Sequence, residues 1–184
     1  MRGIDRIVTD TGPLLALGII NRLDLLVNLY ASVYVPTEVK RELERGAVKY
    51  EDARNALEAV NKGWLIETSV EQIFCKRIEK LMAGPPKLGK AQAESIVSCK
   101  QLNINLLLVD DEDAVKVAQR EGIRTVHGLD TLVNSAKMGS ISPSQALNYI
   151  NKFREIGEYG EEDLREAEER IKSVMQGSKS HDQS

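Results

Sequence analysis

The sequence contains few of the side chains that build thiol or imidazole chemistry: two cysteines and two histidines in 184 residues. Cys75 and Cys99 lie far apart in sequence, with no CxxC pair and no histidine close by. This pattern argues against a zinc site and against a disulfide framework. His127 and His181 have no acid and nucleophile near them in sequence, so we interpret them as a structural and a tail residue.

Long apolar runs are also absent. No segment approaches the roughly 20 apolar residues needed to span a bilayer, and the N-terminus lacks the basic-then-apolar plan of a secretory signal. We therefore expect a cytoplasmic protein with no membrane segment. A Gly-rich phosphate loop is missing too, because Leu88-Gly89-Lys90 is too short a match. With 42% hydrophobic and 29% charged residues, the chain has the composition of one ordinary globular domain.

The net charge of −3 is unevenly distributed along the chain. Residues 155–184 hold nine acidic and four basic side chains, which leaves a small positive excess on residues 1–154. Basic side chains close to acidic motifs would attract a polyanion to them. Most of these basic residues, considered individually, are explained as part of solvated helix faces. The basic residues near the acidic motifs are Lys40, Arg41, Arg45, Lys87, Lys90, Lys116 and Arg120.

Short apolar segments alternate with helical segments, which predicts a parallel α/β sheet covered by helices. The capping-box pairs Ser69/Gln72 and Ser142/Gln145 predict two of the helix starts. The segment at 106–109 is the most apolar and is expected at the centre of the sheet. The predicted strands cover 4–9, 32–35, 64–68, 106–109 and 123–126. The predicted helices cover 13–19, 22–30, 37–45, 51–62, 69–82, 90–102 and 112–121, with two more before residue 154.

The C-terminal part of the sequence does not continue the alternation of strands and helices. We expect a main domain over residues 1–154, a charged helix within 155–176 and a disordered tail over 177–184. The helix has a narrow apolar stripe that predicts docking on the main domain or on a second subunit. The stripe consists of Leu164, Ala167, Ile171 and either Val174 or Met175.

Acidic side chains follow two of the predicted strands. The first strand ends on Asp10 and turns directly into a helix, which Thr11 can cap and whose first turn suits Pro13. Asp110 and Asp111 end the fourth strand. In an open parallel sheet, ligands bind beyond the carboxyl ends of the strands, where strand order reverses. If the first and fourth strands are neighbours, Asp10 and Asp111 face each other at this point.

Carboxylates gathered at one rim favour a bound cation, because two of them about 4 Å apart repel by roughly 4 kcal/mol at an effective dielectric of 20. A donor set made only of oxygen favours Mg²⁺ or Mn²⁺ over zinc. On the helix after Pro36, Glu42 lies nearer the core-facing stripe than Glu38, so Glu42 is our preferred site residue. In the helix over 90–102, Gln92 lies on the apolar side. Glu94 points away from that side and would reach a metal only from the looser first turns.

Simpler roles compete with a metal site. Asp111 can cap the following helix, and Asp113 can be a first-turn acid favoured by the helix dipole. Glu38 and Glu42 can pair with neighbouring cations, and Asp10 can be a turn residue. The triplet Asp-Thr-Gly at 10–12 also matches aspartic proteases, but those are all-β proteins, which the helical periodicity here contradicts.

Four segments, in order, resemble the motifs of the PIN-domain superfamily. The resemblance spans residues 4 to about 150 and includes 128–141, which is similar to the closing segment of one largely uncharacterised prokaryotic branch. It implies an α/β/α sandwich of PIN type, with a metal-dependent ribonuclease activity related to VapC-type toxins and more distantly to flap endonucleases. The four segments are Ile7–Leu14 with Leu23–Leu26, Tyr34–Leu43, Leu88–Ile96 and Leu107–Asp111.

Carried over by position, the resemblance implies roles for individual side chains. The implied catalytic acids are Asp10, Glu42, Glu94 and Asp111. The implied metal ligands are Asp10, Glu94, Asp111, Asp110, Asp113 and Gln92. The side chains expected to contact substrate are Thr11, Lys40, Arg41, Arg45, Lys90 and Lys116. The branch usually has an acid where this chain has Gln92, so the site loses one negative charge there.

We therefore expect endonucleolytic hydrolysis of single-stranded RNA with Mg²⁺ or Mn²⁺, because a site at a sheet rim reaches the phosphates of an unpaired strand most easily. The resemblance further implies a VapC-like toxin with an antitoxin partner and a homodimer. The alternative is a catalytically weak PIN-like scaffold that binds RNA or a protein partner. Gln92, the acidic tail and the striped C-terminal helix favour this alternative.

Overall fold

The computed structural model describes residues 5–179, with side chains described through residue 176. It contains a five-stranded sheet in the order β3-β2-β1-β4-β5, and every neighbouring pair is parallel. This confirms the predicted fold class. The strands are β1 (Arg6–Thr9), β2 (Ser32–Pro36), β3 (Ile66–Thr68), β4 (Leu106–Leu108) and β5 (Arg124–Val126).

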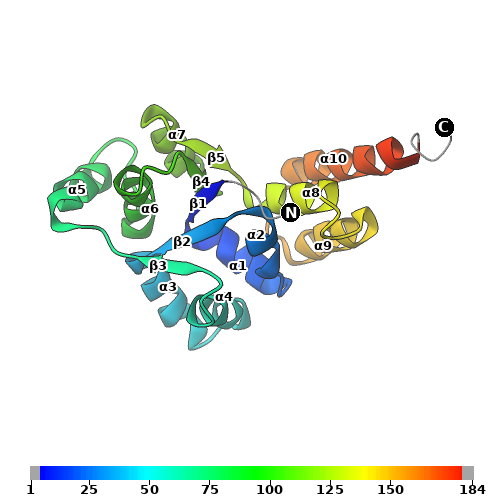
Figure 1. Ribbon diagram of the computed structural model, residues 1–184, viewed down its shortest axis with the longest axis horizontal. Coiled ribbons are helices and arrows are strands. Elements are labelled where there is room, and N and C mark those ends of the chain that lie inside the picture. Colours follow the sequence, from blue (N-terminus) through cyan, green and yellow to red (C-terminus); the bar gives the residue numbers. More distant parts are fainter. Residues whose placement is uncertain (1–4, 180–184) are drawn as a thin grey trace. The chain divides into compact units, whose positions relative to one another are not determined.

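Helices cover both faces of this sheet (Figure 1). On one side α6 packs against β1, β2 and β4, and α1 packs against α4 on the other. The helices of this part of the chain are α1 (Thr11–Ile19), α2 (Asp24–Leu29), α3 (Thr37–Ala47), α4 (Glu51–Asn61), α5 (Cys75–Ala83), α6 (Lys90–Gln101) and α7 (Glu112–Arg120). A short 3₁₀ helix, η1 (Gln72–Phe74), precedes α5.

The strand order reverses between β1 and β4, as the candidate site requires. Val8 pairs with Leu107 and Thr9 with Leu108, and the backbone N–H of Asp10 donates to the carbonyl of Leu108 at 2.9 Å. The central strand is β1, which corrects the expectation that the segment at 106–109 occupies the centre. Arg6 at the start of β1 is exposed, whereas all of β4 is buried, so apolar content favoured β4 although both strands have two neighbours in the sheet.

The expected helix over 69–82 starts later than its capping box indicated. The backbone of residues 69–71 is held as a loop by the side chain of Gln101, which donates to the carbonyl of Ser69 at 2.9 Å and accepts from the N–H of Glu71 at 2.8 Å. The segment therefore satisfies its backbone groups through a distant residue, and η1 and α5 follow it. The third strand is also shorter than 64–68, because Trp64 lies in the preceding turn region.

One compact unit of the chain ends at Gly128 and a second begins at Leu129. The helices after β5 are α8 (Gly128–Lys137), α9 (Pro143–Ile156) and α10 (Glu161–Lys179). The capping box of Ser142 and Gln145 is confirmed at the start of α9. Residues 154 and 155, between which we expected a boundary, lie within α9. The predicted tail begins inside α10, and its residues 180–184 lie outside the described residues.

In the second unit, α9 packs against α10. The α10 stripe of Leu164, Ala167 and Ile171 is buried. Phe153 of α9 contacts Tyr159 edge-to-face, with ring centroids 5.3 Å apart. No helix within the described part of the chain is both long enough and apolar enough to cross a bilayer.

Candidate metal and nucleic-acid site

Asp10 lies directly after β1 at the point where the strand order reverses, and only 6% of it is exposed. Burial raises the pKa of its carboxyl group to about 7, against the opposing effect of the Thr11 backbone N–H. The carboxylates of Glu42, Asp111 and Asp110 raise this pKa further. The structure thus brings four of the expected acids together, and Asp10 is the one that water reaches least.

Ser95 of α6 is a neighbour of Asp10 that the sequence reasoning missed. Its Oγ lies 3.5 Å from Asp10 Oδ1 and donates to the carbonyl of Ala91 at 2.9 Å. The shorter bond takes the hydroxyl proton, so the contact with Asp10 is weak. Ser95 lies inside one of the four PIN-like segments, but its position on the buried side of α6 appears only once the partner strands are known.

Glu42 of α3 is held next to Asp10 by Thr11. The hydroxyl of Thr11 donates to Glu42 Oε2 at 2.5 Å, instead of capping α1 as we expected from the sequence. The residue at the N-cap of α1 is Asp10, and it makes no side-chain capping bond. The Thr11 hydroxyl therefore joins the start of α1 to α3 across the rim.

The two acids that follow β4 have structural partners as well. Asp111 Oδ1 accepts from the N–H of Ala114 at 2.8 Å, which confirms the capping role considered for it. Asp110 Oδ1 accepts from the N–H of Gly128 at 2.7 Å and lies 3.8 Å from His127 Nδ1. Asp110 therefore ties the chain that leaves β5 to the end of β4.

Glu94 does not point away from the core, as the helical wheel indicated. It is 8% exposed, and its Oε2 accepts from the backbone N–H of Glu38 at 2.9 Å, in the first turn of α3. A carboxylate is favoured there by the positive end of the helix dipole. Glu94 is not among the groups that shift the pKa of Asp10. Its expected role as a metal ligand stays a prediction.

The remaining expected ligands make local contacts. Gln92 Oε1 accepts from the N–H of Gly89 at 2.8 Å, which closes the first turn of α6. Asp113 lies 3.6 Å from the ammonium of Lys116, which also pairs with Glu112. Lys40, one of the expected substrate contacts, pairs with Glu67 of β3 at 2.7 Å. None of these residues is among the three acids that raise the pKa of Asp10.

Three other expected substrate contacts form a basic cluster, which we define as Arg41, Arg45 and Lys90. All three reach the carboxylate of Glu38, at 3.4, 3.2 and 2.9 Å. Glu38 is 7% exposed. Its pKa falls to about 2, chiefly because Lys90 donates to it, with further help from Arg45 and Arg41. One carboxylate cannot neutralise three cations, so Glu38 and the basic cluster together keep an excess positive charge, carried by α3 and the start of α6.

The Glu38 interactions predict an effect of pH on stability. Because the folded-state pKa lies below the usual 4.5, the ionised group stabilises the fold above about pH 4.5, and this stabilisation is lost as the pH falls through 2. We expect Glu38→Gln to lower the free energy of unfolding by about 1–3 kcal/mol at pH 7, with a smaller difference at pH 3. Urea denaturation measures this, with Glu44→Gln on the exposed side of α3 as the control. A constant difference from pH 7 to pH 3 would contradict the electrostatic origin.

The acids around Asp10 are a set of hard oxygen donors with a buried negative charge, which fits a cation such as Mg²⁺ or Mn²⁺. Among residues 5–179, no three His, Cys, Asp or Glu side chains are arranged closely enough to enclose a metal ion. Mg²⁺ usually keeps several waters and takes only one or two carboxylates from the protein. The open arrangement therefore fits a partly hydrated ion better than a fully protein-ligated one.

The chain is therefore an α/β protein whose parallel sheet carries acids at the switch between β1 and β4, the edge at which open parallel sheets bind ligands. A family model described as a PIN domain matches residues 6–173. The chain belongs to the PIN-domain family, as its four ordered segments predicted. PIN domains are nuclease-type domains that generally use divalent metal ions and act on nucleic acid. No curated protein matches the chain.

Proposed function

We propose that this protein is an endoribonuclease that hydrolyses single-stranded RNA with Mg²⁺ or Mn²⁺ bound beside Asp10. The observation that carries the proposal is the buried carboxyl group of Asp10, whose pKa is raised to about 7 next to three other acids. Such crowding is unfavourable in the empty protein and becomes favourable when a divalent cation binds. The crowded carboxylates therefore indicate a bound cation that serves the function of the protein.

Asp10, Glu42, Asp111 and Asp110 are the side chains that would hold the ion, in part through water. A divalent ion supplies charge stabilisation at a phosphodiester and lowers the pKa of water. Asp10 must lose its proton for the ion to bind, which a pKa near 7 permits at neutral pH. Thr11 keeps the carboxylate of Glu42 directed toward Asp10. Glu94, Gln92 and Asp113 remain proposed ligands that would have to exchange their present partners.

The basic cluster is the proposed contact for the RNA backbone. Its cations are about half exposed, and α3 carries both Glu42 and two members of the cluster, Arg41 and Arg45. Glu38 holds the charged groups of these three side chains together. A phosphate can therefore replace the water around them without a rearrangement of the side chains. Lys40 and Lys116 are the outer members of the proposed substrate surface, and each would have to leave a surface ion pair, which costs little.

A cleavage assay tests the proposal. The full chain is incubated with an end-labelled unstructured RNA in Mn²⁺, in Mg²⁺ or in EDTA, and with the same RNA annealed to its complement. We expect internal cleavage that requires a divalent ion and that slows on the duplex. Cleavage that persists in EDTA, or an intact RNA under every condition, would refute the proposal.

The proposed biological role is more specific than the proposed reaction. We propose a cytoplasmic VapC-like toxin that acts as a homodimer and is neutralised by an antitoxin protein. A small open reading frame for a DNA-binding protein beside this gene would support the toxin role, and light scattering would test the dimer. A monomer in solution would contradict that part of the proposal alone.

The second candidate is a catalytically weak scaffold that binds RNA or a protein partner. It is favoured by Gln92, whose amide oxygen is already engaged at the start of α6, and by the open arrangement of the acids. A scaffold of this kind would bind RNA without cleaving it and would show no rise in melting temperature with millimolar Mn²⁺ or Mg²⁺.

A further inference from the structure

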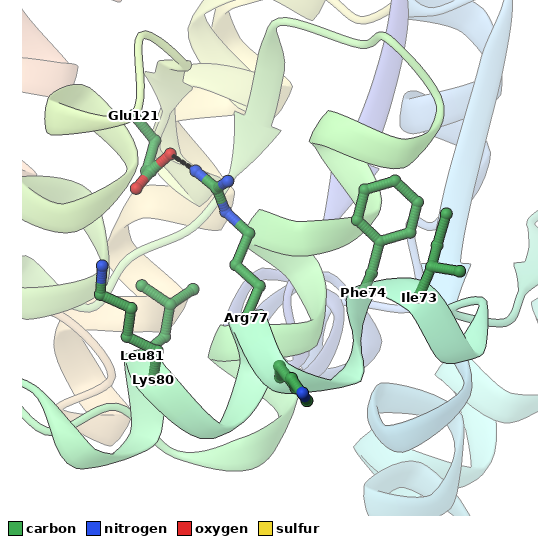
Figure 2. Close-up of a pocket in the computed structure, with 7 residues that line it drawn as sticks. Ile73, Phe74, Arg77, Lys80, Leu81 and Glu121 are labelled. Carbon is green, nitrogen blue, oxygen red and sulfur yellow. Dashed lines mark hydrogen bonds and ion pairs between the residues drawn. The ribbon is translucent and has the colours of Figure 1, made fainter.

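A cleft of about 420 Å³ lies between η1 with α5 and the end of α7. Its volume is within the range of small-ligand sites, and none of the acids around Asp10 lines it. Figure 2 shows Phe74 and Arg77 projecting from the same side of the segment, with Lys80 and Leu81 one turn further along. The lining consists of apolar Ile73, Phe74 and Leu81, basic Lys76, Arg77 and Lys80, and one acid, Glu121.

The walls of this cleft are held in place by contacts from two directions. The guanidinium of Arg77 donates to the carboxylate of Glu121 (Figure 2), and the ammonium of Lys100 donates to the Glu121 carbonyl. The loop before η1 is fixed to the end of α6 by Gln101. The helix that anchors this loop, α6, also carries Ser95 beside Asp10. The segment that lines the cleft is therefore joined through α6 to a neighbour of Asp10.

The lining combines exposed apolar surface with unneutralised positive charge. Ile73 is 79% exposed, and the ring of Phe74 is only half-buried. Lys76 and Lys80 have no acidic partner among the described residues, and the single acid of the lining is taken by Arg77. A local positive excess on a chain of net charge −3 selects for an anionic partner.

We propose that this cleft is a second binding site for single-stranded RNA. A base lies against Phe74 and Ile73, and the flanking phosphates pair with Lys76 and Lys80. Aromatic side chains beside a basic groove are the means by which proteins bind unpaired strands, and a space of this size admits a base but not a helix of a protein partner. The inference rests on the proposed function for its ligand, single-stranded RNA.

Fluorescence anisotropy with a labelled oligouridylate tests this site in EDTA, where no metal-dependent hydrolysis can occur. We expect Phe74→Leu, which keeps the apolar surface and removes the ring, to weaken binding by about 5-fold or more. Phe74→Tyr keeps a ring and should bind as the unchanged protein does. Lys80→Gln should lower the slope of log affinity against log salt by about 0.7, whereas Lys137→Gln, an exposed lysine of α8, should leave it unchanged.

Melting curves of the four variants establish that each is folded. Phe74→Leu and Lys80→Gln proteins that bind the oligouridylate as the unchanged protein does would overturn the proposal, and an acidic protein segment would then be the better occupant. The test is separable from the cleavage assay. Binding through the cleft without any cleavage in Mn²⁺ would refute the nuclease and support the cleft, whereas cleavage with unaltered binding by these variants would do the opposite.

Discussion

Asp10→Asn should abolish metal-dependent RNA cleavage while leaving the protein folded. The amide has the same shape but no charge to attract a divalent ion, and Asp10 is the most buried acid of the site. Loss of even an indirect partner of a metal site typically costs about 10–100-fold in metal affinity or activity. We expect a loss of at least 100-fold for Asp10 itself, measured as the initial rate of RNA cleavage at saturating Mn²⁺.

Two matched variants give the result its meaning. Asp5→Asn changes an exposed aspartate just before β1 and should leave the rate unaltered. Asp113→Asn tests an acid that the family resemblance implies but that the structure pairs with Lys116, and we expect a loss of less than about 10-fold. Full activity of Asp10→Asn would refute the proposed site. Equal losses for all three variants would show that the loss is not specific to Asp10.

The second large effect is on stability as a function of pH. The pKa of Asp10 is about 7 in the folded protein, against 3.8 for an ordinary aspartate. Folding therefore favours the protonated form. Its contribution is fully present below pH 3.8 and is lost as the pH rises through 7, by as much as about 4 kcal/mol. Asp10→Asn is neutral at every pH, so it should melt near the unchanged protein at pH 4 and well above it at pH 8.

A divalent ion should cancel this loss, because it binds the ionised carboxylate. Millimolar Mn²⁺ should raise the melting temperature of the unchanged protein more at pH 8 than at pH 5. It should have little effect on Asp10→Asn at either pH. Differential scanning calorimetry with and without Mn²⁺ measures the shift for both proteins at both pH values. A metal-induced shift that is the same in both proteins would place the ion elsewhere.

Much of the fold could be predicted because local patterns and sheet topology agree in this chain. The three inner strands, β1, β2 and β4, are mainly apolar, β1 and β2 are ended by Asp10 and Pro36, and every strand is followed by a helix. The meeting of Asp10 with Asp111 required only that β1 and β4 be neighbours. Parallel strands carry their C-terminal residues to one edge, so two distant acids could be placed together from strand ends alone.

The parts that could not be predicted depend on partners from distant segments. The helical wheel of α6 predicts that only apolar side chains are buried. Glu94 is buried nevertheless, because its carboxylate accepts a hydrogen bond from a backbone N–H of α3. Glu38 appeared to be the less important acid of α3, yet three cations from two helices converge on it. The Ser69 capping box failed because Gln101 holds the carbonyl of Ser69 and the N–H of Glu71 in a loop. Spacing along one helix contains no information about such contacts.

Asp111 belongs both to the acidic rim and to the beginning of α7. An alanine at this position would remove a charge and unravel a helical turn at once, so a lost activity could come from either. Asparagine caps helices as well as aspartate does, and it lacks the charge. Under the proposed function, the chain could thus exchange catalytic chemistry for a purely architectural side chain at this position by altering one amino acid, and a descendant without nuclease activity would still fold.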